Sequence, residues 1–242
     1  MSVEPSRDPE ETMSAEKAAA LNHFSLGNRY KEGGQYDQAI TEYMKAIKLD
    51  EHLTEAYNNL GIVYKHLGLY KEAIESYEEA IQINPNLSQT HDNLGVVYLE
   101  IGLSDEAIEA LHKAIETNPF NPKAYHNLGA AYENKGQYEY AVHAYKKAIQ
   151  LDPTLMEAFN NLGIIYGRMN AYDQAIEAFK KAIELNPHDA EIHFNLGLTY
   201  RKRGMREEAI REYEEAIRLA PDFKEACKNL AVLKQKGDDY GC

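Results

Sequence analysis

Residues 54–87 read TEAYNNLGIVYKHLGLYKEAIESYEEAIQINPNL, and this stretch decides the fold. Large and small apolar residues open it at the i, i+3, i+4, i+7 spacing of one helical face: Tyr57, Leu60, Gly61 and Tyr64. The spacing predicts an amphipathic helix over the first half of the stretch.

A second stripe with helical spacing fills the other half, at Ala73, Ile74, Tyr77, Ala80 and Ile81. Gly68 suits a turn between the two helices, because glycine reaches positive φ at little cost. Pro85 cannot continue the second helix and marks its end. The stretch is therefore predicted to be a helix–turn–helix whose small residues let the two helices approach closely.

The same pattern returns every 34 residues. The Leu-Gly pairs are Leu26-Gly27, Leu60-Gly61, Leu94-Gly95, Leu128-Gly129, Leu162-Gly163 and Leu196-Gly197. A tyrosine follows each glycine by three positions, at Tyr30, Tyr64, Tyr98, Tyr132, Tyr166 and Tyr200. A fixed period of this length is the mark of a stacked repeat architecture. The repeats are predicted at 20–53, 54–87, 88–121, 122–155, 156–189 and 190–223.

These residues and spacings resemble those of the tetratricopeptide repeat family. The resemblance implies an all-α fold, an α-α superhelix of six helix-turn-helix repeats whose concave wall is made by the first helix of each repeat. It also implies a module that binds other proteins. Departures are few: Glu51 replaces the first proline, and Asn170 replaces the mid-repeat glycine of the fifth repeat.

The two ends of the chain differ from the repeats. Residues 1–19 are expected to be a disordered acidic segment that runs into the first helix. Residues 224–236 continue the pattern of a first helix with no second helix after them, and their other positions are polar. We expect a capping helix there and a flexible tail over 237–242.

The composition excludes several classes of function. A net charge of −13 and a pI near 5.2 argue against nucleic-acid binding, which needs a basic face. No apolar run is long enough for membrane insertion and no signal peptide is visible, so a cytoplasmic location is expected. Phosphate-loop, dinucleotide, HExxH and CxxC motifs are absent, so we expect no enzyme activity, no cofactor and no metal.

The first helices are predicted to present a peptide-binding groove. Counted from the first residue of each repeat, position 6 is asparagine from the second repeat onward: Asn59, Asn93, Asn127, Asn161, Asn195 and, in the capping helix, Asn229. Position 5 adds Asn58, His126 and Asn160. Asparagine is poor in a helix interior, so its recurrence needs a cause. Its amide both donates and accepts, and could hold a peptide backbone. The row resembles the asparagine ladder in the repeat arm of O-linked N-acetylglucosamine transferases. The alternative is that these amides bond between adjacent repeats.

Position 9 is aliphatic from the second repeat to the sixth: Ile62, Val96, Ala130, Ile164 and Leu198. These side chains either receive a ligand's apolar groups or pack against the next repeat. Cations gather in the later repeats, including Arg168 and Arg201. We expect an acidic end of the ligand near the sixth repeat, so that charge reversal at these two arginines weakens binding; the alternative is a solvated rim.

Three functions remain open on the sequence alone. The first is an adaptor that holds an extended peptide or partner segment in the groove. The second is a homo-oligomeric assembly scaffold, since self-association is possible. The third is the substrate-recognition arm of a larger enzyme such as a glycosyltransferase. Replacing Asn127 and Asn161 by alanine separates the first two, because only the adaptor loses its partner at unchanged mass.

Overall fold

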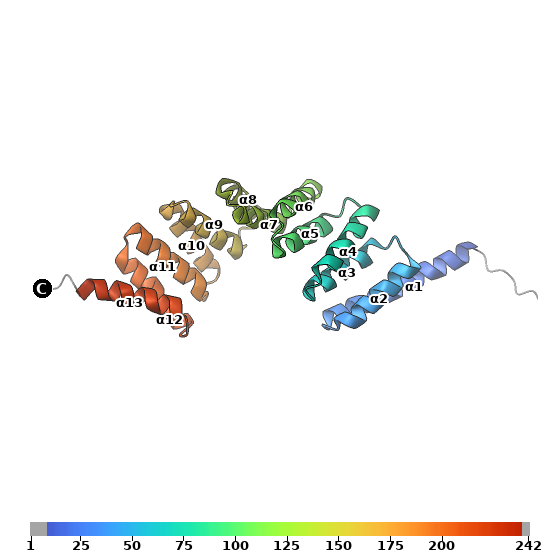
Figure 1. The fold of residues 1–242 in the computed structure, drawn as a ribbon, viewed down its shortest axis with the longest axis horizontal. Coiled ribbons are helices and arrows are strands. Elements are labelled where there is room, and N and C mark those ends of the chain that lie inside the picture. The colour runs from blue at the N-terminus through green and yellow to red at the C-terminus, as the bar shows by residue number, and fades with distance from the viewer. Residues whose placement is uncertain (1–8, 239–242) are drawn as a thin grey trace, which may run out of the picture. The chain divides into compact units, whose positions relative to one another are not determined.

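The computed structural model describes residues 9–238, and this range consists of helices and short connections without a strand (Figure 1). The helices group into two compact units that divide between Pro119 and Phe120. The N-terminal unit holds α1 (Pro9–Glu32), α2 (Tyr36–Leu49), α3 (Thr54–His66), α4 (Tyr70–Ile83), α5 (Ser88–Glu100) and α6 (Ser104–Thr117). The C-terminal unit holds α7 (Pro122–Asn134), α8 (Tyr138–Leu151), α9 (Met156–Arg168), α10 (Tyr172–Leu185), α11 (Ala190–Arg203), α12 (Arg206–Leu219) and α13 (Lys224–Asp238).

Within each unit, every helix packs against the next one along the chain. The tightest associations are within pairs, such as α3 with α4 and α9 with α10. The second helix of one pair then packs on the first helix of the following pair, as α4 does on α5. This is the stacking that a helix pair needs to cover its apolar face.

A glycine in the first helix of each pair allows the close approach. A Cβ atom added to Gly61 would lie 2.6 Å from the ring of Tyr77, and one added to Gly129 would lie 2.6 Å from Tyr145. The remaining pairs have the same contact: Gly27–Tyr43, Gly95–Leu111, Gly163–Phe179 and Gly197–Tyr213. The large partner is fully buried or nearly so in every pair. The small and large residues of the sequence pattern therefore fit one another as predicted.

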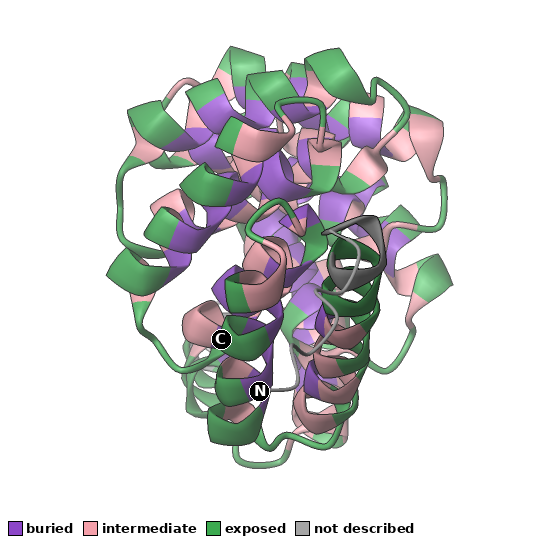
Figure 2. Cartoon of the chain, turned by 90° about the vertical axis from the view of Figure 1, so that its right-hand side faces the viewer, coloured by how far each residue is buried: buried purple, intermediate pink, exposed green. Residues whose placement is uncertain are grey.

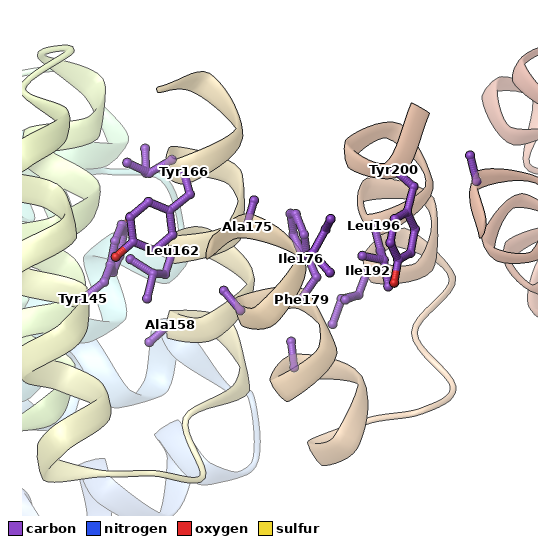
Figure 3. Packing of buried hydrophobic residues seen from close by; sticks show 14 of the residues in the cluster. Tyr145, Ala158, Leu162, Tyr166, Ala175, Ile176, Phe179, Ile192, Leu196 and Tyr200 are labelled. Carbon is purple, nitrogen blue, oxygen red and sulfur yellow. The ribbon is translucent and has the colours of Figure 1, made fainter. Parts of the chain in front are cut away.

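The core of the C-terminal unit continues from pair to pair. Figure 3 shows Ile176 and Phe179 of α10 beside Ile192 of α11, which belongs to the next pair. Burying an aliphatic or aromatic side chain of this size stabilises the folded state by about 2 kcal/mol. Figure 2 shows the buried segments, in purple, on the helix sides that meet other helices.

The turn inside the fifth repeat shows how asparagine replaces glycine. Gly68 has φ +73° in the equivalent turn of the second repeat, and Asn170 has φ +59°. Asparagine is one of the few residues that enter this left-handed region routinely. The Tyr172 hydroxyl also donates a hydrogen bond to Oδ1 of Asn170 at 2.7 Å.

The expectation of disorder over residues 1–19 is wrong for residues 9–19, which form the start of α1. Pro9 is the first helical residue, where proline is favoured, and residues 10–19 are rich in the helix formers Glu, Ala, Met and Lys. The expected tail likewise begins later, since α13 continues to Asp238. The expected disorder of residues 1–8 and the expected flexible tail over residues 239–242 lie outside the described residues. Over the described residues, no helix is both long and apolar enough to cross a membrane.

Candidate functional site

The predicted groove residues lie on the first helix of each pair or, for Asn229, on α13, and none of them is fully buried. We call the side of these helices that carries positions 5, 6, 9 and 13 the inner face. Ile62 packs at the edge of the N-terminal core, and Ile164 and Leu198 pack at the edge of the C-terminal core. Val96 and Ala130 are also half-buried. The aliphatic positions thus pack partly against the core while keeping a surface open.

In the N-terminal unit, the position-6 asparagines bond to the preceding first helix. Nδ2 of Asn59 donates to Oδ1 of Asn28 at 2.7 Å. Nδ2 of Asn93 donates to Oδ1 of Asn58 at 3.2 Å, and the hydroxyl of Thr90 donates to the same oxygen at 3.1 Å. The amide nitrogens are therefore used between adjacent repeats, which was the alternative raised on the sequence.

Asn161 of the C-terminal unit uses its amide nitrogen in the same way. Nδ2 of Asn161 lies 3.0 Å from Nε2 of His126, as a donor to that ring nitrogen. The capping helix differs, because Nδ2 of Asn229 donates to the Glu225 carbonyl of its own helix and its Oδ1 accepts from Arg201 at 2.6 Å. Across the described residues, Oδ1 of Asn59, Asn93 and Asn161 receives no hydrogen bond. These oxygens remain free to accept a hydrogen bond, and the three residues are half-buried.

A pocket of about 160 Å³ opens on the inner face of the C-terminal unit, between α9 and α11. It brings together four of the predicted residues: Ile164, Arg168, Asn195 and Leu198. The other lining residues are Gly163, Gly167, Phe179, Thr199 and Lys202. The pocket thus combines an apolar floor, one amide and two cations, and its lining includes no carboxylate.

A hydrogen-bonded chain fixes one of the two cations. The buried Tyr145 hydroxyl donates to Oε2 of Glu133 at 3.0 Å, and the other oxygen of Glu133 lies 3.2 Å from Nη1 of Arg168. Burial, followed by the charge of Glu133, raises the pKa of Tyr145, so the hydroxyl keeps its proton and stays a donor. The second cation, Lys202, forms no ion pair with any described residue. One cation is therefore held in place and the other is available to a ligand.

Tetratricopeptide repeat models match the chain at 54–87, 122–155, 157–189, 190–223 and 76–109, and a further TPR model matches 27–68 and 104–136. Together these matches cover well over half of the chain.

The chain belongs to the tetratricopeptide repeat family.

Solved structures show the same relationship. MamA is 30% identical, and the alignment covers 71% of this chain and 94% of MamA with a TM-score of 0.65. YrrB, described as a TPR protein with an unusual peptide-binding site, is 23% identical over 77% of this chain and 96% of its own, with a TM-score of 0.66. PilF of Pseudomonas aeruginosa is 19% identical over 90% of this chain and 99% of its own, with a TM-score of 0.77. The last two show the fold alone, which is the predicted all-α repeat solenoid. Comparison with curated proteins gave no match.

Of the two arginines predicted to bind a ligand in these tetratricopeptide repeats, the structure places only one in the pocket. Arg168 lines the pocket, whereas Arg201 bonds to Asn229 and is not part of the lining. Lys202, one residue further on, takes the place in the pocket that Arg201 was expected to have. The helical register contains the signal, because Arg168 and Lys202 both stand at position 13 and Arg201 stands at position 12.

The remaining predicted residues are not part of this pocket. Asn160 is half-buried, and its Oδ1 is buried without a hydrogen-bond partner among the described residues. Asn127 is half-buried on α7. Over the described part of the chain, no three His, Cys, Asp or Glu side chains converge as metal ligands would.

Proposed function

We propose that this chain is a non-catalytic protein-interaction module that binds an extended segment of a partner along the inner face of the C-terminal unit. An acidic group of that segment enters the pocket between α9 and α11. Membership of the tetratricopeptide repeat family supports the general role of protein interaction. A related fold, that of YrrB, carries a peptide-binding site.

The pocket is the observation that carries the proposal. Ile164 and Leu198 offer apolar surface to a side chain, and Arg168 and Lys202 stand at its rim with their positive charges. A carboxylate placed there gains charge-assisted hydrogen bonds, which are stronger than neutral ones. Gly167 adds room, because nothing lies within 4 Å of where its Cβ would be.

The asparagine oxygens support an extended backbone as the ligand. The donor halves of Asn59, Asn93 and Asn161 are engaged inside the protein, so these amides offer acceptors and not the two-sided contact first expected. An extended peptide exposes N–H groups that can donate to such acceptors. The proposed ligand contact is therefore peptide N–H to asparagine Oδ1.

The proposal is tested with peptides selected from a random phage-displayed library on the intact protein. We expect the selected peptides to contain an acidic residue or to use their terminal carboxylate. Fluorescence anisotropy should then show about tenfold or more loss of affinity in the double variant Arg168→Glu, Lys202→Glu. The loss should shrink as salt is raised, because part of it is electrostatic.

A charge-matched control is Lys180→Glu with Lys224→Glu, two exposed lysines of α10 and α13 that form no ion pair with described residues. This control should bind the selected peptides as the unchanged protein does. Peptides without any acidic group, or equal affinity for the pocket variant, would contradict the proposal. Light scattering on the same samples reports self-association, the expected sign of the scaffold alternative.

A further inference from the structure

A larger cavity, of about 390 Å³, lies in the N-terminal unit away from the inner face. The second helices α4 and α6 form its walls, and the core-facing side of α5 forms its floor. Ile81, Leu94 and Tyr98 supply the apolar and aromatic surface. The asparagine Asn93 stands on another side of α5, so this cavity is separate from the inner face and its proposal does not depend on the first one.

Three carboxylates surround the floor of this cavity: Glu78 from α4, and Glu106 and Glu109 from α6. None of the three forms a hydrogen bond or an ion pair with a described residue. The one lysine in the lining, Lys113, donates from Nζ to Oε2 of Glu116 at 2.9 Å, and Glu116 is not part of the lining. The cavity therefore has negative charge without a matching cation.

A buried histidine is a second polar feature of the cavity lining, independent of the carboxylates. His91 is only 8% exposed, and its Nε2 donates to the Pro85 carbonyl at 2.9 Å. A carbonyl oxygen can only accept, so the proton of the neutral ring is on Nε2, and Nδ1 is an acceptor. No described residue bonds to Nδ1. The neighbour that would face it, Ala110, also lines the cavity.

Two other repeats show what normally faces this ring nitrogen. Nδ1 of His23 bonds to Glu42 at 2.6 Å, and Nδ1 of His193 bonds to Glu212 at 2.7 Å. Both glutamates stand at position 23 of their repeats, where the third repeat has Ala110. His193 also bonds through Nε2 to a proline carbonyl, as His91 does, so the two rings have the same orientation. The glutamate in those repeats accepts a hydrogen bond from Nδ1, whereas the third repeat has no carboxylate at this position and leaves Nδ1 of His91 open to a donor.

The C-terminal unit shows how an equivalent cavity accommodates a cation. Its cavity, of about 330 Å³, lies between α8, α9 and α10 and uses the same positions of the repeat. Lys146 stands at position 25 there, and its Nζ lies 5.7 Å from the centre of the Tyr166 ring, within cation–π range. In the N-terminal cavity, Tyr98 takes the place of Tyr166, but position 25 is Glu78.

We propose that the cavity between α4, α5 and α6 binds a basic side chain, arginine or lysine, from a protein partner. The cation lies over the ring of Tyr98, as Lys146 lies over Tyr166, and neutralises Glu78, Glu106 and Glu109. An N–H of the same group donates to Nδ1 of His91. The three carboxylates and the Tyr98 ring favour a cation, and Nδ1 of His91 can accept a hydrogen bond from it.

The test is an NMR titration of the intact protein labelled at alanine and leucine methyl groups. The probe is a flexible glycine–serine peptide with one arginine, and the comparison probes replace that arginine by lysine or by citrulline, which has the same shape and no charge. We expect the arginine or the lysine peptide to shift the methyl signals of Leu94 and Ala110. The citrulline peptide should bind at least tenfold more weakly.

One variant blocks the cavity directly. Glu78→Lys installs the residue found at the same position in the C-terminal unit, and it should weaken binding of the basic peptide at least tenfold. Glu139→Lys on α8 makes the same charge change at an exposed position outside every described cavity, and it should change binding less than twofold. The proposal is overturned if neither basic peptide shifts these methyls, if citrulline binds equally well, or if Glu78→Lys behaves as Glu139→Lys does.

Discussion

The two cavities that lie between second helices, one in each unit, use the same positions of the repeat but differ in charge. Each has an apolar floor with leucine at position 7 and tyrosine at position 11. Around that floor, Glu78 and Glu106 of the N-terminal unit correspond to Lys146 and Gln174 of the C-terminal unit. Buried positions therefore keep the stack constant, while the positions around them set the charge of each cavity.

The two units also differ in the hydrogen bonding of their buried tyrosines. Tyr77 and Tyr145 fill equivalent places against a glycine. The Tyr145 hydroxyl donates to Glu133, whereas the Tyr77 hydroxyl is buried without a hydrogen-bond partner in the described part of the chain. Both units thus bury a tyrosine ring at this place, but only in the C-terminal unit does its hydroxyl donate a hydrogen bond to a described residue.

The largest expected effect concerns the glycine–tyrosine contact, which both units share and which should contribute equally to the stability of each. Gly61→Ala and Gly129→Ala each put a Cβ atom 2.6 Å from a buried tyrosine ring, so the ring must shift. We expect each change to lower the free energy of unfolding by about 2 kcal/mol, because overpacking outweighs the better helix propensity of alanine. Urea unfolding followed by circular dichroism measures both.

The control for this pair is Gly167→Ala, which has open space around the added Cβ. It should raise the free energy of unfolding by up to about 1 kcal/mol through helix propensity. If Gly61→Ala and Gly129→Ala changed the free energy of unfolding as Gly167→Ala does, the close glycine contact would not be needed to hold the helix pairs together.

A smaller effect should separate the two units. Tyr145→Phe removes a hydrogen bond to a carboxylate and should cost about 1 kcal/mol of unfolding free energy. Tyr77→Phe removes a hydroxyl without a partner and should be neutral or slightly stabilising. Both variants keep the ring that packs on the glycine, so each controls for the other. Equal costs in the same urea experiment would refute the difference between the units.

The smallest effect concerns the histidine–glutamate contact that the third repeat lacks. The ammonium of Lys45 and, after it, the ring of His23 lower the pKa of Glu42 below its usual 4.5. A carboxyl with a lowered folded-state pKa stabilises the fold above its unfolded pKa, and this stabilisation is lost as pH falls through the folded-state value. Glu42→Gln should therefore be less stable than the unchanged protein at neutral pH.

The stability gap between the unchanged protein and Glu42→Gln should close as the pH falls below 4.5. Urea unfolding at a series of pH values measures the gap. A gap that stays constant into acid would mean that the ionised carboxylate of Glu42 contributes nothing to the stability. Glu139→Gln, at an exposed position, serves as the matched control and should show no gap at any pH.

The fold was predictable because its determinants are short-range and periodic. Gly61 and Tyr77 recur with their spacing in every repeat, so one helix pair predicts the others. The sequence does not predict the start of α1, because acidic residues beside proline are typical of disordered segments; here Glu10 and Glu11 follow Pro9 in the first turn of a helix, where acidic residues are favoured.

The site was predictable only in part, because its chemistry depends on neighbours that are distant in sequence. The half-buried state of Asn93 follows from helical register, but its bond to Asn58 depends on the repeat before it. The place of Lys202 in the pocket could be predicted from Arg168, because both residues stand at position 13 of their repeats and so lie on the same side of the first helix. The environment of Nδ1 of His91 depends on position 23 of its repeat, which is on a different helix and carries glutamate in the first and sixth repeats but alanine in the third.

The most direct test of the central claim is a methyl NMR titration of the intact protein with a peptide selected for binding. If the inner face of the C-terminal unit is the binding site, the methyl signals of Ile164 and Leu198 should shift with saturation, and those of Leu94 and Ala110 should stay in place. Shifts confined to Leu94 and Ala110, or to methyls remote from α9 and α11, would contradict the account.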